Sequence, residues 1–214
     1  MDRLAITTVW TSLLLIQAAS LNASELIVRV ENSSGKPVAD AVIYVATDAG
    51  TPTRAPQTAA VIDQVDKEFI PYVTAVQVGS QINFPNNDAI RHHVYSFSPA
   101  KQFELPLYKG DAARPVLFEK VGVVALGCNI HDWMSSYVFV AATPWFAITD
   151  QNGVARLDLP QSGVALEVWH PRLKGEPGAT RRQLAAGSKE LAFRIEEKTL
   201  FRSFRGPGTA KAGY

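Results

Sequence analysis

The chain has 214 residues, of which 47% are hydrophobic and 19% are charged, and its formal net charge is +1. This apolar fraction excludes a disordered chain, and the lack of a regular glycine repeat excludes a collagen-like one. Lysine and arginine are spread along the chain, so nucleic acid is not an expected partner. The single cysteine, Cys128, excludes an internal disulfide, a paired-cysteine redox motif and covalent haem attachment.

The N-terminus predicts export from the cytoplasm. Asp2 and Arg3 precede an apolar stretch over residues 4–19, which is typical of a secretory signal peptide. A membrane anchor is the competing interpretation, but this stretch is interrupted by threonine and serine and falls short of the roughly 20 residues that a span needs. We expect a signal peptide over residues 1–23, cleaved after Ala23 or alternatively after Ser20, and a periplasmic mature chain without a membrane span.

The mature chain predicts an all-β protein. Short runs rich in β-branched residues alternate with turn residues at hairpin-like spacing, and no helical period is sustained. The predicted strands cover residues 25–30, 41–46, 73–78, 81–84, 93–97, 115–118, 121–126 and 137–142. Residues 48–60 read as a linker and residues 201–214 as a mobile tail. A β-sandwich is the expected architecture.

One segment gathers side chains that bind metals. The string GCNIHDWM follows an apolar strand and places Cys128, His131 and Met134 on one loop. A thiolate, an imidazole and a thioether suit copper, and a second imidazole is available from His92 or His93 upstream. Cysteine and methionine also fill ordinary cores, but their joint spacing in an exported chain with a single cysteine favours a metal site. Strand alternation alone permits either His92 or His93.

The same residues carry a resemblance to a known family. Residues 76–142 resemble a cupredoxin, in the strings VQVGSQINFPNND and FEKVGVVALGCNIH, and the cysteine-to-methionine spacing is similar to that of amicyanin. The strings RHHVYSFSPAK, FELPLY and GCNIHDWM resemble bacterial exported proteins of the methylamine utilisation type. The resemblance implies a Greek-key β-sandwich with one type 1 copper, held by His92, Cys128 and His131 with Met134 as axial ligand.

Two positions depart from the cupredoxin pattern. The family pattern His-x-Val favours His92 over His93 as ligand, which leaves His93 where asparagine commonly stands. Arg91 replaces the proline that commonly precedes the ligand histidine. The sequence therefore leaves open how the loop around the copper is held rigid.

The flanks resemble a second module. The strings LIVRVENSSGKPVADAVIYVAT and FAITDQNGVARLDLPQSGVALEVWHPRL resemble the two halves of a carboxypeptidase regulatory-like domain. We expect residues 24–52 and 143–200 to form one Ig-like sandwich, ending in a strand with Phe193, and residues 56–142 to be a cupredoxin domain inserted into it. A single larger sandwich is the alternative.

Electron transfer by Cu(I)/Cu(II) cycling is the expected function, with His131 as the exit for electrons. Trp133 and Trp145 are candidate contacts for a periplasmic redox partner such as a c-type cytochrome or a dehydrogenase. A copper carrier or sensor without electron transfer is the alternative. An enzyme is not expected, because four protein ligands leave copper no open position. His170 lies outside the copper set in sequence, and whether it faces the copper domain stays open.

Overall fold

The computed structural model describes residues 24–46, 59–111, 114–159, 163–175 and 178–198. The predicted signal peptide, the predicted tail and all but the last two residues of the predicted linker lie outside this part. Within it every regular element is a strand, as the sequence predicts, and no helix is long and apolar enough to cross a membrane.

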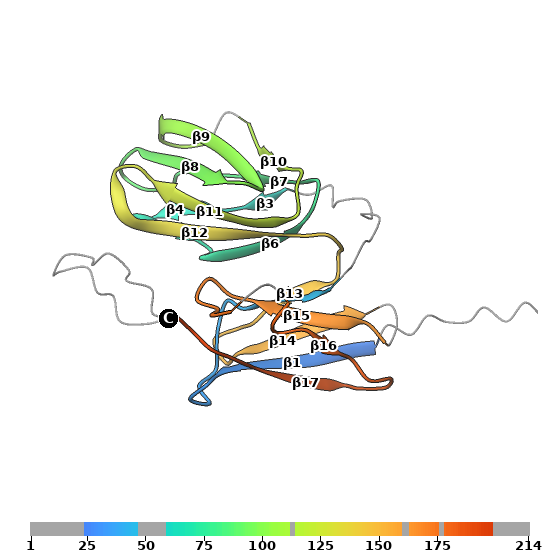
Figure 1. Ribbon diagram of the computed structural model, residues 1–214. Coiled ribbons are helices and arrows are strands. Elements are labelled where there is room, and N and C mark those ends of the chain that lie inside the picture. Colours follow the sequence, from blue (N-terminus) through green and yellow to red (C-terminus); the bar gives the residue numbers. More distant parts are fainter. Residues whose placement is uncertain (1–23, 47–58, 112–113, 160–162, 176–177, 199–214) are drawn as a thin grey trace, which may run out of the picture.

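Two β-sandwiches lie one above the other in Figure 1. The first, here called the flanking sandwich, contains strands from both ends of the described chain. It has seven strands, namely β1 (Ser24–Asn32), β2 (Val42–Val45), β13 (Phe146–Ile148), β14 (Val154–Leu159), β15 (Ala165–Trp169), β16 (Arg182–Gln183) and β17 (Glu190–Ile195).

In the flanking sandwich, β1 lies between β14, which is antiparallel to it, and β17, which is parallel. The second sheet has the order β13-β2-β15-β16. The alternating pattern of β1 turns Leu26, Val28 and Val30 inward, where they join a largely aliphatic core that also contains Phe193 of β17. A turn at Gly153 needs glycine, because φ is 70° and a Cβ there would meet the carbonyl oxygen of Val30 at 2.5 Å.

The second, here called the central sandwich, contains only strands from the middle of the chain. Its sheets have the orders β10-β7-β3 and β6-β12-β11-β8-β9, beside a small hairpin of β4 and β5. The strands are β3 (Ala60–Val61), β4 (Asp63–Val65), β5 (Glu68–Ile70), β6 (Val73–Gln77), β7 (Ser80–Asn83), β8 (His92–Ser98), β9 (Lys101–Tyr108), β10 (Val116–Phe118), β11 (Gly122–Cys128) and β12 (His131–Ala141).

A cluster rich in aromatic side chains joins the two sandwiches. On the outer face of the five-stranded sheet, Tyr137 and Phe139 of β12 contact Trp169 of β15, with ring centroids 5.9 and 5.5 Å apart. Tyr44 of β2 stacks on Phe139 at 4.6 Å. In the described residues each sheet contains strands of only one sandwich, and whether the two fold as separate domains remains a prediction for experiment.

Two of these strands differ from the sequence prediction. Strand β9 was not predicted because Pro106 interrupts its pattern, but β9 is an edge strand, where proline is tolerated. The predicted linker ended at Ala60, which already lies in β3. Trp145, a candidate partner contact, is partly buried against the core of the flanking sandwich, and its role as a contact stays a prediction.

Candidate metal centre

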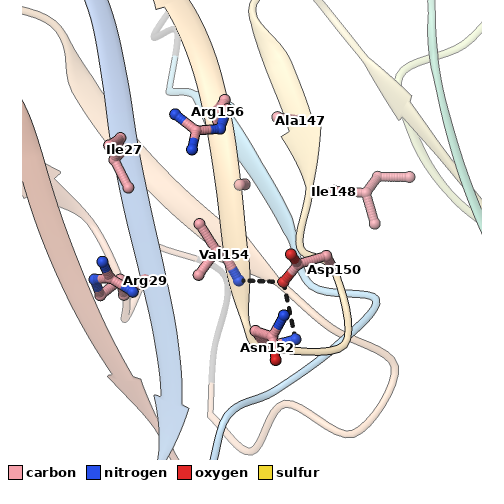
Figure 2. A pocket seen from close by; sticks show the side chains of 9 residues that line it. Ile27, Arg29, Ala147, Ile148, Asp150, Asn152, Val154 and Arg156 are labelled. Carbon is pink, nitrogen blue, oxygen red and sulfur yellow. Dashed lines mark hydrogen bonds between the residues drawn. The ribbon is translucent and has the colours of Figure 1, made fainter.

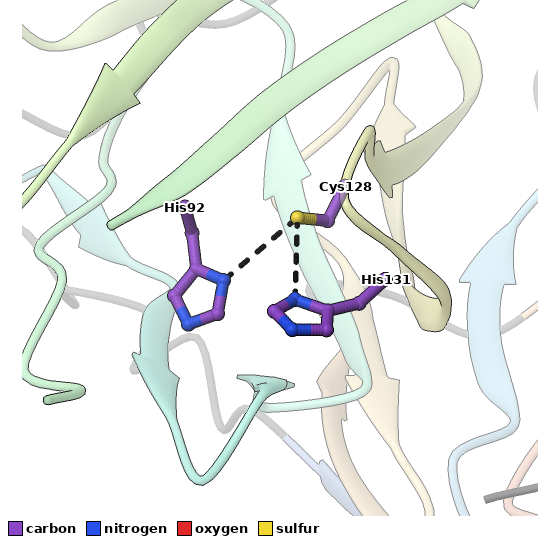
Figure 3. Close-up of side chains that lie close together, drawn as sticks. All are labelled: His92, Cys128 and His131. Carbon is purple, nitrogen blue, oxygen red and sulfur yellow. Dashed lines mark hydrogen bonds between the residues drawn. The ribbon is translucent and has the colours of Figure 1, made fainter. Parts of the chain in front are cut away.

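Three side chains that can bind a metal meet at one end of the five-stranded sheet (Figure 3). His92 begins β8, Cys128 ends β11 and His131 begins β12. The sulfur of Cys128 lies 3.8 Å from Nδ1 of His92 and 3.8 Å from Nδ1 of His131. One donor atom from each residue lies within 4.8 Å of the others.

A tight hairpin brings Cys128 and His131 together. The sequence predicts a loop here, but β11 and β12 are joined by only Asn129 and Ile130, and Cys128 pairs directly with His131. The register shifts between Gly127 and Cys128, which marks a β-bulge. A bulge re-aims the side chains that follow it, so that here the thiol and imidazole lie close together.

The donors are shielded from solvent to different degrees. His92 is 0% exposed and Cys128 is 4% exposed, whereas His131 is only partly buried. Burial, with the nearby charges of His92 and Lys67, lowers the pKa of His131. A lowered pKa favours the neutral imidazole, which has the lone pair that a metal requires.

A carboxylate lies behind His92. Nε2 of this ring is 2.8 Å from Oδ2 of Asp88, and its Nδ1 faces the cysteine sulfur. Backbone N–H groups of Lys67 and Ala89 also donate to the Asp88 carboxylate, at 2.7 and 2.6 Å. Burial raises the pKa of Asp88, but these hydrogen bonds outweigh it and hold the pKa below its usual range. Such a partner fixes the ring and leaves Nδ1 free for a metal.

Asn86 holds the loop that carries Asp88 and His92. Its side-chain amide donates to the carbonyl oxygens of Ile90 at 3.0 Å and Tyr108 at 2.7 Å, and its Oδ1 accepts from the N–H of Asp88. Its backbone exchanges two hydrogen bonds with Gly110. This buried residue stiffens the loop without the proline that Arg91 replaces.

Neither Asn86 nor Asp88 was identified from the sequence. The string Pro85-Asn86-Asn87-Asp88 reads as a turn, which is correct, because asparagine and aspartate bond to backbone groups a few residues on. The only sequence signal for these two residues is that turn pattern. The pattern does not show that the carboxylate of Asp88 reaches the second ring nitrogen of His92.

The structure separates the two adjacent histidines. His93 turns away from the cluster, and its Nε2 lies 3.0 Å from Oε1 of Glu104 on the outer face of the sheet. Met134 is 2% exposed and belongs to the same buried cluster as Cys128. The ring of Trp133 lies 5.1 Å from that of His131. The assignment of His92, Cys128, His131 and Met134 as ligands remains a prediction for spectroscopy.

The histidine left open by the sequence, His170, belongs to a different polar group. It is buried in the flanking sandwich, with Nδ1 3.9 Å from Oε1 of Glu197, which also pairs with Arg172 at 2.7 Å. Burial, together with the charge of Arg172, lowers the pKa of His170 to about 4. It contributes nothing to the three-donor cluster.

A hollow in the flanking sandwich carries no comparable chemistry (Figure 2). It has a volume of ≈ 590 Å³ and lies between β1, β13 and β14. The carboxylate of Asp150 accepts hydrogen bonds from the backbone N–H groups of Asn152 and Val154, and these bonds lower its pKa. Arg156 pairs with Glu25 at 3.1 Å. These side chains stabilise the turn and the sheet surface.

The three donors fit a single soft metal ion. Two donors that each lie about 2.0–2.3 Å from one ion are themselves about 3.5–4 Å apart, as the sulfur is from each imidazole nitrogen here. One thiolate and two imidazoles are the donor set of a blue copper site. Zinc also accepts these ligands, but it commonly takes a fourth strong donor in a closed site.

No protein-family profile and no curated protein matches the chain. Among solved structures it is similar to a purple cupredoxin from Nitrosopumilus maritimus, with 22% identity and a TM-score of 0.35 over 38% of this chain and 99% of that one. A reduced amicyanin variant has 21% identity and a TM-score of 0.36, over 46% of this chain and 98% of that one.

A copper-containing nitrite reductase from Thermus scotoductus has 22% identity and a TM-score of 0.38, over 46% of this chain and 25% of that one. The residues of the candidate site form a buried thiol between two imidazoles, at the end of an all-β sandwich.

Proposed function

We propose that the protein is a type 1 copper protein that transfers single electrons in the cell envelope. The observation that carries the proposal is the buried sulfur of Cys128, 3.8 Å from the Nδ1 atoms of both His92 and His131. When bound, copper supplies a one-electron Cu(I)/Cu(II) couple. The envelope location rests on the predicted signal peptide.

The protein supplies a rigid binding site. Asp88 fixes the ring of His92, and Asn86 fixes the loop that carries both, so that this donor is held before metal binds. A site whose donors stay in place between two oxidation states keeps the cost of reorganisation low. Met134, buried in the same cluster, is proposed as the weak axial ligand.

The partly exposed edge of His131 is the proposed exit for electrons, with the adjacent ring of Trp133 as an apolar contact. A c-type cytochrome or a dehydrogenase of the periplasm is the proposed partner. Burial of Cys128 and His92 favours electron transfer over the alternative role of a copper carrier, because metal handover needs a donor that an acceptor can reach. No catalytic role is proposed.

The test is the visible spectrum of the mature protein loaded with Cu(II). We expect an intense absorption band from charge transfer between thiolate and copper, and Cys128→Ser should abolish it while the far-UV circular dichroism of the fold stays the same. Ser135→Ala, on β12 one residue before the buried Ser136, serves as a control and should keep the band. A colourless Cu(II) protein, or a band that survives Cys128→Ser, would contradict the proposal.

A further inference from the structure

The outer face of the five-stranded sheet is divided into two halves. The half formed by β6 and β12 is covered by the flanking sandwich, where Tyr137 and Phe139 contact Trp169. The half formed by β8, β9 and β11, here called the open face, has no such cover among the described residues, and there Phe97 is 78% exposed. One exposed ring is common on a protein surface, so its neighbours decide whether it belongs to a binding site.

A second ring lies beside Phe97 and across the sheet. Tyr95 of β8 pairs with Gly127 of β11, and a Cβ added to Gly127 would meet Cζ of Tyr95 at 2.8 Å and its Oη at 2.9 Å. The ring of Tyr95 therefore leans over the neighbouring strand, where only glycine leaves room for it. Its centroid lies 5.1 Å from that of Phe97. The two side chains form one continuous aromatic surface.

A hollow of ≈ 510 Å³ adjoins the two rings, and this volume falls in the range of sites for small molecules. Hydroxyl, amide and carboxylate side chains line it together with the rings, namely those of Ser98, Asn129, Asp132 and Ser135. The side chains of Asn129 and Asp132 are exposed, and neither has a hydrogen bond or an ion pair to another described residue. Their bonding capacity is available to a ligand.

Exposed aromatic faces beside groups that bond hydroxyls suit a sugar. A pyranose ring presents weakly positive C–H groups, which the negative face of an aromatic ring attracts. Sugar hydroxyls both donate and accept hydrogen bonds, and a carboxylate and an amide together offer acceptors and donors. The residues next to Phe97 on the open face are small or polar, as Ala125 and Gln102 show, whereas a stable protein interface has a broad apolar core.

We infer that the open face binds an oligosaccharide, with a sugar ring stacked on Phe97 and Tyr95 and its hydroxyls bonded by Asn129 and Asp132. The inference does not rest on the proposed function, because the binding needs no metal. No bond forms or breaks. The open face is a binding site for carbohydrate, next to the metal centre but separate from it in its chemistry.

The charge of the open face selects among sugars. Asp132 lies in the hollow, and Glu104 lies directly opposite Tyr95 on β9, where its side chain pairs with His93 and stays 68% exposed. An amino sugar fits these carboxylates, because its ammonium group is attracted both to them and to the ring faces. An acidic sugar is repelled by them. An oligosaccharide of amino sugars is therefore the inferred ligand.

Isothermal titration calorimetry of the whole mature chain, as purified, tests the inference. The probes are three tetrasaccharides, namely a β-linked glucosamine tetramer, neutral cellotetraose and acidic tetragalacturonate. We expect saturable binding of the glucosamine tetramer, binding of cellotetraose that is several-fold weaker, and no binding of tetragalacturonate. The inference is wrong if neither of the first two binds, or if the acidic tetramer binds as tightly as the glucosamine tetramer.

Substitutions on the open face test the stacked ring and the charge separately. Phe97→Ala should weaken binding of the glucosamine tetramer about tenfold, which corresponds to about 1.4 kcal/mol, whereas Phe97→Tyr should keep it because the ring remains. Asp132→Asn should weaken binding of the glucosamine tetramer several-fold and leave cellotetraose unchanged. Leu107→Ala is the matched control, since Leu107 is 52% exposed on β9 but does not line the hollow. Equal affinities for Phe97→Ala and the parent would overturn the inference.

The position of the ligand is checked by NMR. On addition of the glucosamine tetramer, the amide signals of Phe97, Gly127 and Asn129 should shift, and that of Val154, in the hollow of the flanking sandwich, should not. Shifts that gather at Val154 instead would contradict the site. If no sugar binds and Phe97→Ala instead lowers self-association in sedimentation experiments, the open face is a contact between copies of the chain and the inference is wrong.

Discussion

The two sandwiches of this chain stabilise their interiors in different ways. The core of the flanking sandwich is almost entirely aliphatic, built from Leu26, Val28, Val30 and similar residues. The central sandwich has such a core too, but one end of it contains Asn86, Gln64 and His92, all 2% exposed or less. Buried polar groups cost free energy unless they are bonded, and here they are bonded to one another and to the backbone around the candidate site.

The two sandwiches also differ in the parts of the chain that their polar networks hold in place. At the metal end, Gln64 donates to the hydroxyl of Tyr108, which donates to the carbonyl oxygen of Phe84. Burial, partly offset by the Gln64 hydrogen bond, raises the pKa of Tyr108 to about 12. In the flanking sandwich a polar group around Glu197 joins β1 to the last described residues. The first network holds a loop for chemistry, and the second holds strands together.

The largest expected effect is confined to the metal-binding end of the central sandwich. His92→Ala should abolish the visible band of the copper-loaded protein, because it removes a donor that lies 3.8 Å from the cysteine sulfur. His93→Ala is the matched control and should keep the band, since His93 faces Glu104. Absorption spectra of the two variants check this. Loss of the band in His93→Ala with its survival in His92→Ala would transfer the ligand role to the neighbour.

Removing the central sandwich tests whether the flanking sandwich folds without it. Residues 24–46 joined directly to residues 146–198 should fold, because the ends meet: the N–H of Val45 donates to the carbonyl oxygen of Trp145 at 3.0 Å. Exposure of Trp169 and Val42 should lower the unfolding free energy by about 2–4 kcal/mol. Chemical denaturation measures whether the joined chain unfolds cooperatively and how large its unfolding free energy is. A chain without a cooperative transition would contradict separate folding of the flanks.

Residues 59–142 form the complementary piece. We expect them to fold and to bind copper, since all four proposed ligands lie within this range. The exposed faces of Tyr137 and Phe139 should make this piece less soluble than the whole chain. If neither piece folds, the chain behaves as a single cooperative unit.

A substitution in the metal-end network tests how much that network contributes to stability. Asn86→Ala removes two donated hydrogen bonds and one accepted one at a buried position, and should lower the unfolding free energy of the apoprotein by about 2–4 kcal/mol. Asn87→Ala, at the exposed next position, should cost less than about 1 kcal/mol. Urea denaturation compares the two. Equal losses would show that the network does not hold the loop.

The sequence predicted the strands better than their ends. Period-two alternation and β-branched residues identify β1, β6 and β11, because both signals are local. It missed β9, whose Pro106 is tolerated because, among the described residues, no further strand pairs beyond it. Edge position depends on which strands neighbour one another, and a single sequence does not show this.

For the candidate site, the donor types and their spacing could be predicted from the sequence, but their supporting contacts could not. The CxxH spacing brings Cys128 and His131 together in any tight turn or hairpin. The choice between His92 and His93 needs the register of β8, and the contact of Tyr95 with Gly127 needs the pairing of β8 with β11. Both are long-range facts that arise only when strands assemble.

The smallest expected effect lies in the flanking sandwich, at low pH. His170 has a pKa of about 4 in the folded protein, mainly because it is buried, and also because Arg172 is near; Glu197 opposes the shift. Between about pH 6.5, the usual value for histidine, and about pH 4, the unfolded chain binds one more proton than the folded one. Stability therefore rises with pH across this window, and acidification should lower the unfolding free energy by about 1–3 kcal/mol.

Urea denaturation of the metal-free chain at pH 7 and pH 4.5 measures this loss, and His170→Gln should reduce it because glutamine cannot titrate. His131, whose pKa is also lowered, contributes equally to both proteins and cancels in their difference. An identical pH dependence in the two proteins would show that His170 is not held neutral by burial.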